Sequence, residues 1–212
     1  FRNLQTNVVA TLSSNFTELF CVLVGFALIP FGLPAVILPI QILLVDLVGE
    51  MLPLLMLTYD PSDPELMGRP PRKKGALLDR RKLLTIAASG FVRGTLSTAV
   101  FILVYRQMAG KPNAWETGLS ATFVTIVLTQ FISIFYLRST RGAFSSYSFS
   151  NPYLFLGIGL SAIAMLCIVY IPQLNVYLHT QPLGGAEFRF IGAALGIFAL
   201  FSSLWRRLTG AD

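Results

Sequence analysis

Three carboxylates lie inside long apolar stretches of this sequence, where ionisable side chains are rare. Glu18 stands in the first stretch, and Asp46 and Glu50 stand one helical turn apart in the second. An ionised side chain near the centre of a lipid bilayer costs roughly 2.5–3.5 kcal/mol on insertion scales. Acids kept at that cost most often handle cations or protons, so these three residues form the candidate functional site.

The stretch around Asp46 and Glu50 has the composition of an interrupted helix. Pro53 lacks the N–H that would bond the carbonyl of Gly49, and its ring pushes that carbonyl away. Gly49 permits local unwinding, so we expect a freed backbone oxygen between the two acids. Carboxylates and carbonyls are the ligands of a hard cation such as Ca²⁺, and interrupted helices are tolerated where they line a cavity. In the alternative interpretation, Pro53 only kinks the helix and the acids bind protons or pair internally.

Polar side chains accompany Glu18 along one stripe of its predicted helix. Thr11, Asn15 and Glu18 follow the spacing i, i+4 and i+7, with Ser14 beside them. Because such a stripe is unfavourable against lipid, it should face other helices or water. We interpret Asn15 and Glu18 as candidate cation ligands, and Thr11 and Ser14 as groups that hydrogen-bond between helices.

Three more polar residues need an assignment. Arg93 lies midway along a third apolar stretch, where it either pairs with one of the acids or extends to the membrane interface. Gln130, in the fourth stretch, offers an amide oxygen as a further ligand. His179 stands alone in a loop, and we assign it no role.

A membrane-spanning scaffold must position these residues. Only 12% of the 212 residues are charged, against about 25% in a typical soluble domain, and 54% are hydrophobic. The net charge of +6 could indicate nucleic-acid binding, but the basic residues flank the apolar blocks as loop charges do. We therefore predict an integral, multi-pass protein of the lipid bilayer, with one membrane domain over residues 1–212 and no nucleic-acid partner.

The fold class is predicted to be all-α, a polytopic bundle of six transmembrane helices. Six stretches are long enough to cross about 30 Å of hydrocarbon. A short turn at 30–34 should make the first two an antiparallel hairpin. The predicted spans are 8–29, 35–57, 84–105, 117–137, 153–171 and 188–204.

The distribution of basic residues predicts the orientation of these spans, because cytoplasmic loops carry an excess of Lys and Arg. If every span crosses, one side of the membrane holds most of the basic residues and the other holds only Arg106, Lys111 and Arg189. We therefore expect both termini to be cytoplasmic, in a plasma or an organellar membrane. The basic residues of that side are Arg2, Arg69, Arg72, Lys73, Lys74, Arg80, Arg81, Lys82, Arg138, Arg141, Arg206 and Arg207.

Three motifs, in this order, resemble the C-terminal half of type II P-type cation-transporting ATPases, which include calcium and sodium pumps. Ser-Asn-Phe-Thr-Glu at 14–18 resembles the Ser-Asn-x-x-Glu of the family's fifth membrane helix. Residues 41–53 resemble the ion-binding segment of the sixth helix. Residues 60–72, which end in Met-Gly-Arg-Pro-Pro-Arg, resemble the cytoplasmic loop that follows. The resemblance extends over essentially the whole chain.

The resemblance implies that the six spans are equivalent to the last six helices of such a pump. It also implies that the basic loop contacts the phosphorylation domain and couples phosphorylation to ion movement. Five residues fall on the family's cation-ligand positions, and the Gly49 carbonyl completes our candidate set. The five are Asn15, Glu18, Asp46, Glu50 and Gln130.

Some of these positions depart from the calcium-pump pattern. Asp46 matches sodium and proton/potassium pumps, where calcium pumps usually have Asn. Glu50 replaces the usual Asp, Gly49 the usual Thr, and Gln130 a Glu of the sarcoplasmic type. The implied transported cation is therefore either Ca²⁺ or a monovalent ion such as Na⁺, K⁺ or H⁺.

The family's phosphorylated Asp-Lys-Thr-Gly-Thr motif does not occur in this sequence, which begins at Phe1. We therefore expect a piece of a longer ATPase whose other parts bind ATP and Mg²⁺. Its expected partners are the first four membrane helices and the phosphorylation, nucleotide-binding and actuator domains. By this interpretation the chain alone does not hydrolyse ATP. Two alternatives remain, namely a free-standing protein that conducts protons or cations passively, and a structural membrane module.

Overall fold

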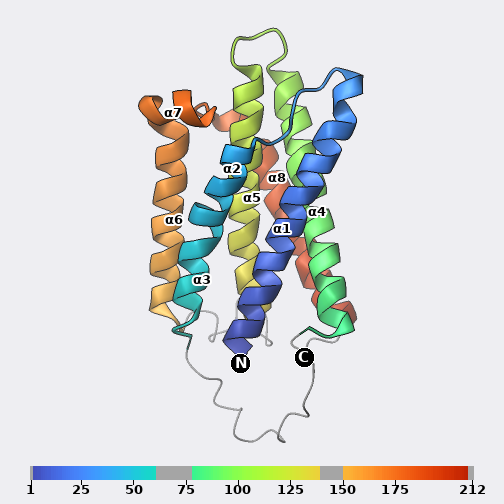
Figure 1. Cartoon of the computed structure of the whole chain (residues 1–212), viewed down its shortest axis with the longest axis vertical. Helices are drawn as coiled ribbons and strands as arrows, with labels where there is room; N and C mark the ends of the chain where they lie inside the picture. Colours follow the sequence, from blue (N-terminus) through green and yellow to red (C-terminus); the bar gives the residue numbers. More distant parts are fainter. Residues whose placement is uncertain (1, 61–77, 139–149, 210–212) are drawn as a thin grey trace, which may run out of the picture.

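A computed structural model describes residues 2–60, 78–138 and 150–209. These residues form a bundle of helices, and six helical stretches among them are long and apolar enough to cross a membrane (Figure 1). The predicted all-α bundle of six spans is confirmed. In chain order the elements are α1 (Arg2–Leu28), the 3₁₀ turn η1 (Ile29–Phe31), α2 (Pro39–Leu44), the π-helix η2 (Val45–Met51), α3 (Leu52–Leu57), α4 (Arg80–Gln107), α5 (Ala114–Arg138), α6 (Pro152–Tyr170), α7 (Pro172–Leu178) and α8 (Gly185–Thr209).

The second span consists of α2, η2 and α3 and starts later than predicted. It begins at Pro39 rather than at residue 35, because proline fits the first turn of a helix, where its missing N–H is not needed. Ala35 remains outside the helix, and its carbonyl accepts a hydrogen bond from Trp115 Nε1 at 2.9 Å. The hairpin between the first two spans is thereby tied to the start of α5.

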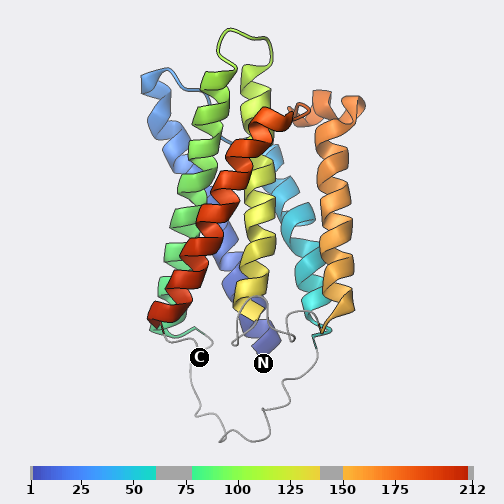
Figure 2. The same ribbon diagram turned by 180° about the vertical axis from the view of Figure 1, so that it is seen from behind.

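Helix α5 is the centre of the bundle. Every side chain of 117–127 is buried, and α5 contacts α1, α4, α6, α8 and η2. Seen from behind, α8 runs obliquely across the bundle and packs against α4 and α5 (Figure 2). Since α5 touches the elements that carry the predicted acids, it is the helix against which a site can be assembled.

Close packing of α4 on α1 depends on two glycines. A Cβ added to Gly90 would lie 2.6 Å from Phe16 Cδ1, and one added to Gly94 would lie 2.5 Å from Phe20 Cδ1. Only residues without a side chain allow the two phenylalanines to press against the backbone of α4, as small residues do in many membrane helix pairs. This contact fixes the position of α1, and hence of Glu18, relative to α4.

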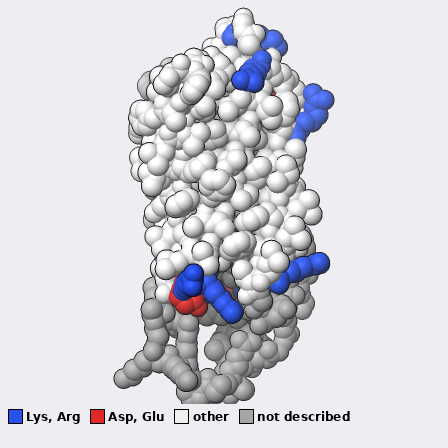
Figure 3. Space-filling model, turned by 90° about the vertical axis from the view of Figure 1, so that its right-hand side faces the viewer, with Lys and Arg blue, Asp and Glu red and all other residues white. Residues whose placement is uncertain are grey.

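Both ends of the described bundle carry basic residues, and one end gathers several helix ends (Figure 1 and Figure 3). The start of α1 and the end of α8 lie at the same end, together with the ends of α3 and α5 (Figure 1). One side of the molecule shows Lys and Arg near both ends and a broad uncharged band between them (Figure 3). Part of the predicted basic loop, including Arg69, Arg72, Lys73 and Lys74, and also Arg141, lies outside the described residues.

A buried ion pair joins helix ends at this same end of the bundle. Arg138, at the end of α5, meets Asp60, just after α3, with Nη2 and Oδ1 2.6 Å apart and side chains 1% and 3% exposed. Asn151 donates to Asp60 Oδ1 at 3.0 Å and also caps the start of α6 through its own oxygen. Asn3 of α1 donates to the Asp60 carbonyl at 3.3 Å. Asp60, just after α3, thus connects the ends of three other helices, α5 and α6 through its carboxylate and α1 through its backbone carbonyl.

Candidate functional site

The helix around the second pair of acids is widened rather than broken. We expected local unwinding at Gly49, but 45–51 form a continuous π-helical segment that contains Asp46, Gly49 and Glu50. Pro53 lies two residues after this segment and has no N–H for either an i+4 or an i+5 bond, which explains why the regular helix is disturbed here. Short π-helical segments of this kind are frequent at functional sites.

Glu50 points from this π-helix into the protein interior. Its side chain is 5% exposed, and Gln130 Nε2 on α5 donates to its Oε1 at 3.0 Å. The approach is close because Gly49 faces α5, where an added Cβ would lie 3.2 Å from Val127 Cγ2. Gln130 is fully buried, and its Oε1 has no hydrogen-bond partner among the described residues. A free amide oxygen therefore lies beside a buried carboxylate.

Glu18 reaches the same region from α1. It is 5% exposed and accepts a hydrogen bond from Ser14 Oγ at 3.3 Å. The hydroxyls of Ser14 and Thr11 also interact with Glu50. The two polar residues that we interpreted as interhelical bonding groups thus link α1 to the π-helix at the two acids.

Asp46 and Asn15 lie at the margin of this arrangement. Asp46 is partly exposed but interacts electrostatically with both Glu18 and Glu50. Asn15 is exposed on the surface of the bundle, although it is only three residues from Glu18. The structure therefore brings Glu18, Glu50 and Gln130 together inside the protein and leaves Asp46 and Asn15 at or near the surface.

Arg93 does not reach the membrane interface, which was one of its two predicted arrangements. Its side chain is fully buried, with Nε donating to Thr129 Oγ1 and Nη2 to the Ile126 carbonyl, both at 3.2 Å. Nη1 has no partner among the residues that the structure describes. The guanidinium interacts electrostatically with Glu50 and Glu18 without a direct ion pair to either.

Sequence reasoning did not identify Thr129 and Ile126 as the anchors of Arg93. Thr129 directly precedes Gln130, so two consecutive polar residues in an apolar helix were an available signal. The sequence gives no signal for the Ile126 carbonyl, since any backbone carbonyl can accept a hydrogen bond.

Carboxylate, amide and hydroxyl oxygens on α1, η2 and α5 together form a set of hard-cation ligands. Within the described ranges, no three His, Cys, Asp or Glu side chains are placed to hold a metal ion by themselves. Any cation bound here must therefore also draw on neutral oxygens such as Gln130 Oε1. The acids that the sequence predicted converge only in part.

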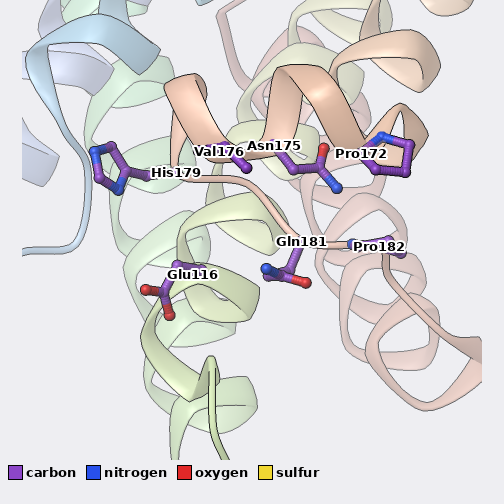
Figure 4. A pocket seen from close by; sticks show the side chains of 7 residues that line it. All are labelled: Glu116, Pro172, Asn175, Val176, His179, Gln181 and Pro182. Atoms are coloured by element: carbon purple, nitrogen blue, oxygen red, sulfur yellow. The ribbon is translucent and has the colours of Figure 1, made fainter.

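A hollow lies at the opposite end of the bundle from the start of α1 and the end of α8 (Figure 1). It has a volume of about 330 Å³ and lies between α7 and the start of α5 (Figure 4). His179, which looked isolated in the sequence, lines it together with Glu116 and Gln181. These residues include no further acid, so this hollow lacks the ligand set found around Glu50.

Known proteins resemble this chain over most of its length. Residues 34–209 match the family model described as "Cation transporting ATPase, C-terminus". A calcium-transporting ATPase of Bacillus subtilis is 31% identical over 210 residues, which are 98% of this chain and 23% of the relative. Calcium-transporting ATPase 1 of Saccharomyces cerevisiae is 28% identical over 98% of this chain and 22% of its own length.

A third relative carries a less specific name. Probable cation-transporting ATPase F of Mycobacterium tuberculosis is 30% identical over 213 residues, which cover 96% of this chain and 21% of that protein. The chain therefore spans less than a quarter of the length of the curated relatives it matches.

Proposed function

This chain belongs to the family of cation-transporting ATPase C-terminal domains, and from that premise we propose that it carries the transport site of an ATP-driven cation pump. The observation that supports this most strongly is that Gln130 binds Glu50 directly and that Glu18, from a third helix, interacts electrostatically with Glu50. Buried acids inside a membrane bundle are unfavourable unless they bind a ligand or pair with one another. An amide oxygen left without a partner beside them fits an incoming cation.

Ca²⁺ is the cation that we propose, because two of the relatives above are named as calcium-transporting. It takes roughly six to eight oxygen ligands. Glu18, Glu50 and Gln130 Oε1 would form the core of the site, with Asp46 and the Gly49 carbonyl at its edge. Asn15 is exposed in this chain. It would become a ligand on the face of α1 that other membrane helices of the longer protein cover, and those helices would supply the remaining ligands.

The proposed cycle assigns binding to this chain and energy input to other parts of the longer protein. Those parts would bind ATP and Mg²⁺ and become phosphorylated, which tilts the helices between two states of different affinity and sidedness. The acids must lose their protons before a metal ion binds, so counter-transport of protons follows from the ligand chemistry. The chain acts as one membrane domain, with the end that holds the start of α1 and the end of α8 facing the cytoplasm.

The test is phosphorylation of the full-length protein by ATP, screened over Ca²⁺, Na⁺, K⁺ and pH. We expect Ca²⁺ to stimulate formation of the phosphorylated protein, because an occupied site favours the state that accepts phosphate. If no cation changes the amount of phosphorylated protein, the pump assignment is wrong.

The same preparation distinguishes the two alternative functions. A passive conductor would carry Ca²⁺ or protons into vesicles without ATP. A structural module would bind cations equally well after Glu18→Gln and Asp46→Asn.

A further inference from the structure

Arg93 is a fully buried cation in the part of the bundle where a transported cation would bind. Two of its nitrogens are occupied on α5, by the Thr129 hydroxyl and the Ile126 carbonyl. Both acceptors are neutral, so they position the guanidinium without cancelling its charge. Nη1, the remaining terminal nitrogen, has no partner in the described part of the chain.

Helix packing places this charge beside the acids. On α1, Thr17 Oγ1 lies 3.4 Å from the Gly90 carbonyl, and Cys21 Sγ lies 3.7 Å from the Gly94 carbonyl. Glu18 therefore occupies the α1 position that adjoins the α4 turn carrying Arg93. On α5, Thr129, which holds Arg93, directly precedes Gln130, which holds Glu50.

The charge balance of the site follows from this placement. Glu18, Asp46 and Glu50 carry three negative charges when ionised, and Arg93 offsets one of them. Two negative charges remain, which is the charge that one divalent cation neutralises. Because the interior has a low effective dielectric constant, a fixed charge there strongly affects the binding of any further charge.

We propose that Arg93 is a specificity-determining residue that acts as a resident counter-charge, limiting how much positive charge the carboxylate cluster accepts. This inference rests on the proposed function, since it assumes that the cluster binds the transported cation. Arg93 does not contact the ion; it acts through its electrostatic field on the ligands. In a purely structural role, by contrast, it would only join α4 to α5 through its hydrogen bonds.

The two roles differ in what happens when the charge is removed and when it is kept. Arg93→Gln retains hydrogen-bonding capacity but removes the repulsion of an incoming ion. Arg93→Lys retains the positive charge but cannot reproduce both hydrogen bonds of a planar guanidinium. If Arg93 acts through its charge, only Arg93→Gln changes the Ca²⁺ affinity. If Arg93 only joins α4 to α5, both variants change it.

The experiment measures the Ca²⁺ concentration that half-saturates ATP phosphorylation of the full-length protein at fixed pH. Arg93→Gln is expected to lower this concentration about tenfold, and Arg93→Lys to leave it within about threefold of wild type. Size-exclusion profile and thermal unfolding report whether each variant is folded. Should Arg93→Gln fail to fold, the value for Arg93→Lys still decides.

Three results would overturn the inference. One is a folded Arg93→Gln protein with unchanged or weaker Ca²⁺ affinity. Another is a folded Arg93→Lys protein whose affinity departs from wild type by more than about threefold. The last is a wild-type protein that shows no cation dependence, which overturns the proposed function as well and is thereby distinguishable from the other two.

Discussion

Glu50→Gln in the full-length protein is expected to raise the Ca²⁺ concentration needed for half-maximal phosphorylation about 100-fold, because cation affinity in oxygen sites follows the charge count of the ligands. The substitution is nearly isosteric and keeps an oxygen that can accept the hydrogen bond of Gln130 Nε2. The fold should therefore survive while the site loses one of its two fully enclosed charges. Phosphorylation measured against a buffered series of free Ca²⁺ gives the shift directly.

The matched control is Glu116→Gln, the same chemical change at the other end of the bundle. Glu116 lines the hollow beside His179 and is not part of the proposed ligand set. Its replacement should leave the half-saturating Ca²⁺ concentration within about threefold of wild type, a change that corresponds to well under 1 kcal/mol. Equal shifts for both variants would show that Glu50 acts through general charge or stability rather than as a ligand.

Arg138→Met is expected to lower the free energy of unfolding of the membrane domain by about 3–5 kcal/mol, because it removes one partner of a buried ion pair while the other stays buried. Both side chains of this pair are almost completely enclosed. Asn151 would still donate to Asp60, but one amide does not replace a guanidinium that donates twice. Thermal unfolding of the wild type and the variant, side by side in the same detergent, measures the loss.

Two comparisons give this prediction its specificity. Arg106→Met removes an exposed arginine and should change stability by no more than about 0.5 kcal/mol. The double variant Asp60→Asn with Arg138→Met should be more stable than Arg138→Met alone, because it removes both charges of the buried pair rather than one. If Arg138→Met is as mild as the Arg106 control, the ion pair does not hold the helix ends together.

The spans were predictable because a bilayer imposes its thickness on the sequence. The fifth predicted span, 153–171, differs from α6 by one residue at each end. Helix ends outside the hydrocarbon leave no such signal, so α1 begins at Arg2 although its apolar run starts at residue 8. Pro39 was visible in the sequence, but whether it interrupts a helix or starts one depends on the residues before it.

The candidate site was only partly predictable. Residue types and the resemblance both singled out Glu50 and Gln130, which the fold places in direct contact, although 80 residues separate them. The rotation of each helix about its own axis cannot be predicted from the sequence. Sequence reasoning therefore grouped Asn15 with Glu18, whereas the packing of α1 buries one and exposes the other. The anchors of Arg93 and the partner of Asp60 were hidden for the same reason.

The most direct measurement is the location of the ion in a structure of the full-length protein with Ca²⁺ bound. The account predicts one ion within about 2.3–2.6 Å of a Glu50 carboxylate oxygen and of Gln130 Oε1, with Glu18 contributing to the same site. A Ca²⁺ ion bound elsewhere in the membrane, with the direct hydrogen bond between Gln130 and Glu50 still intact, would contradict it.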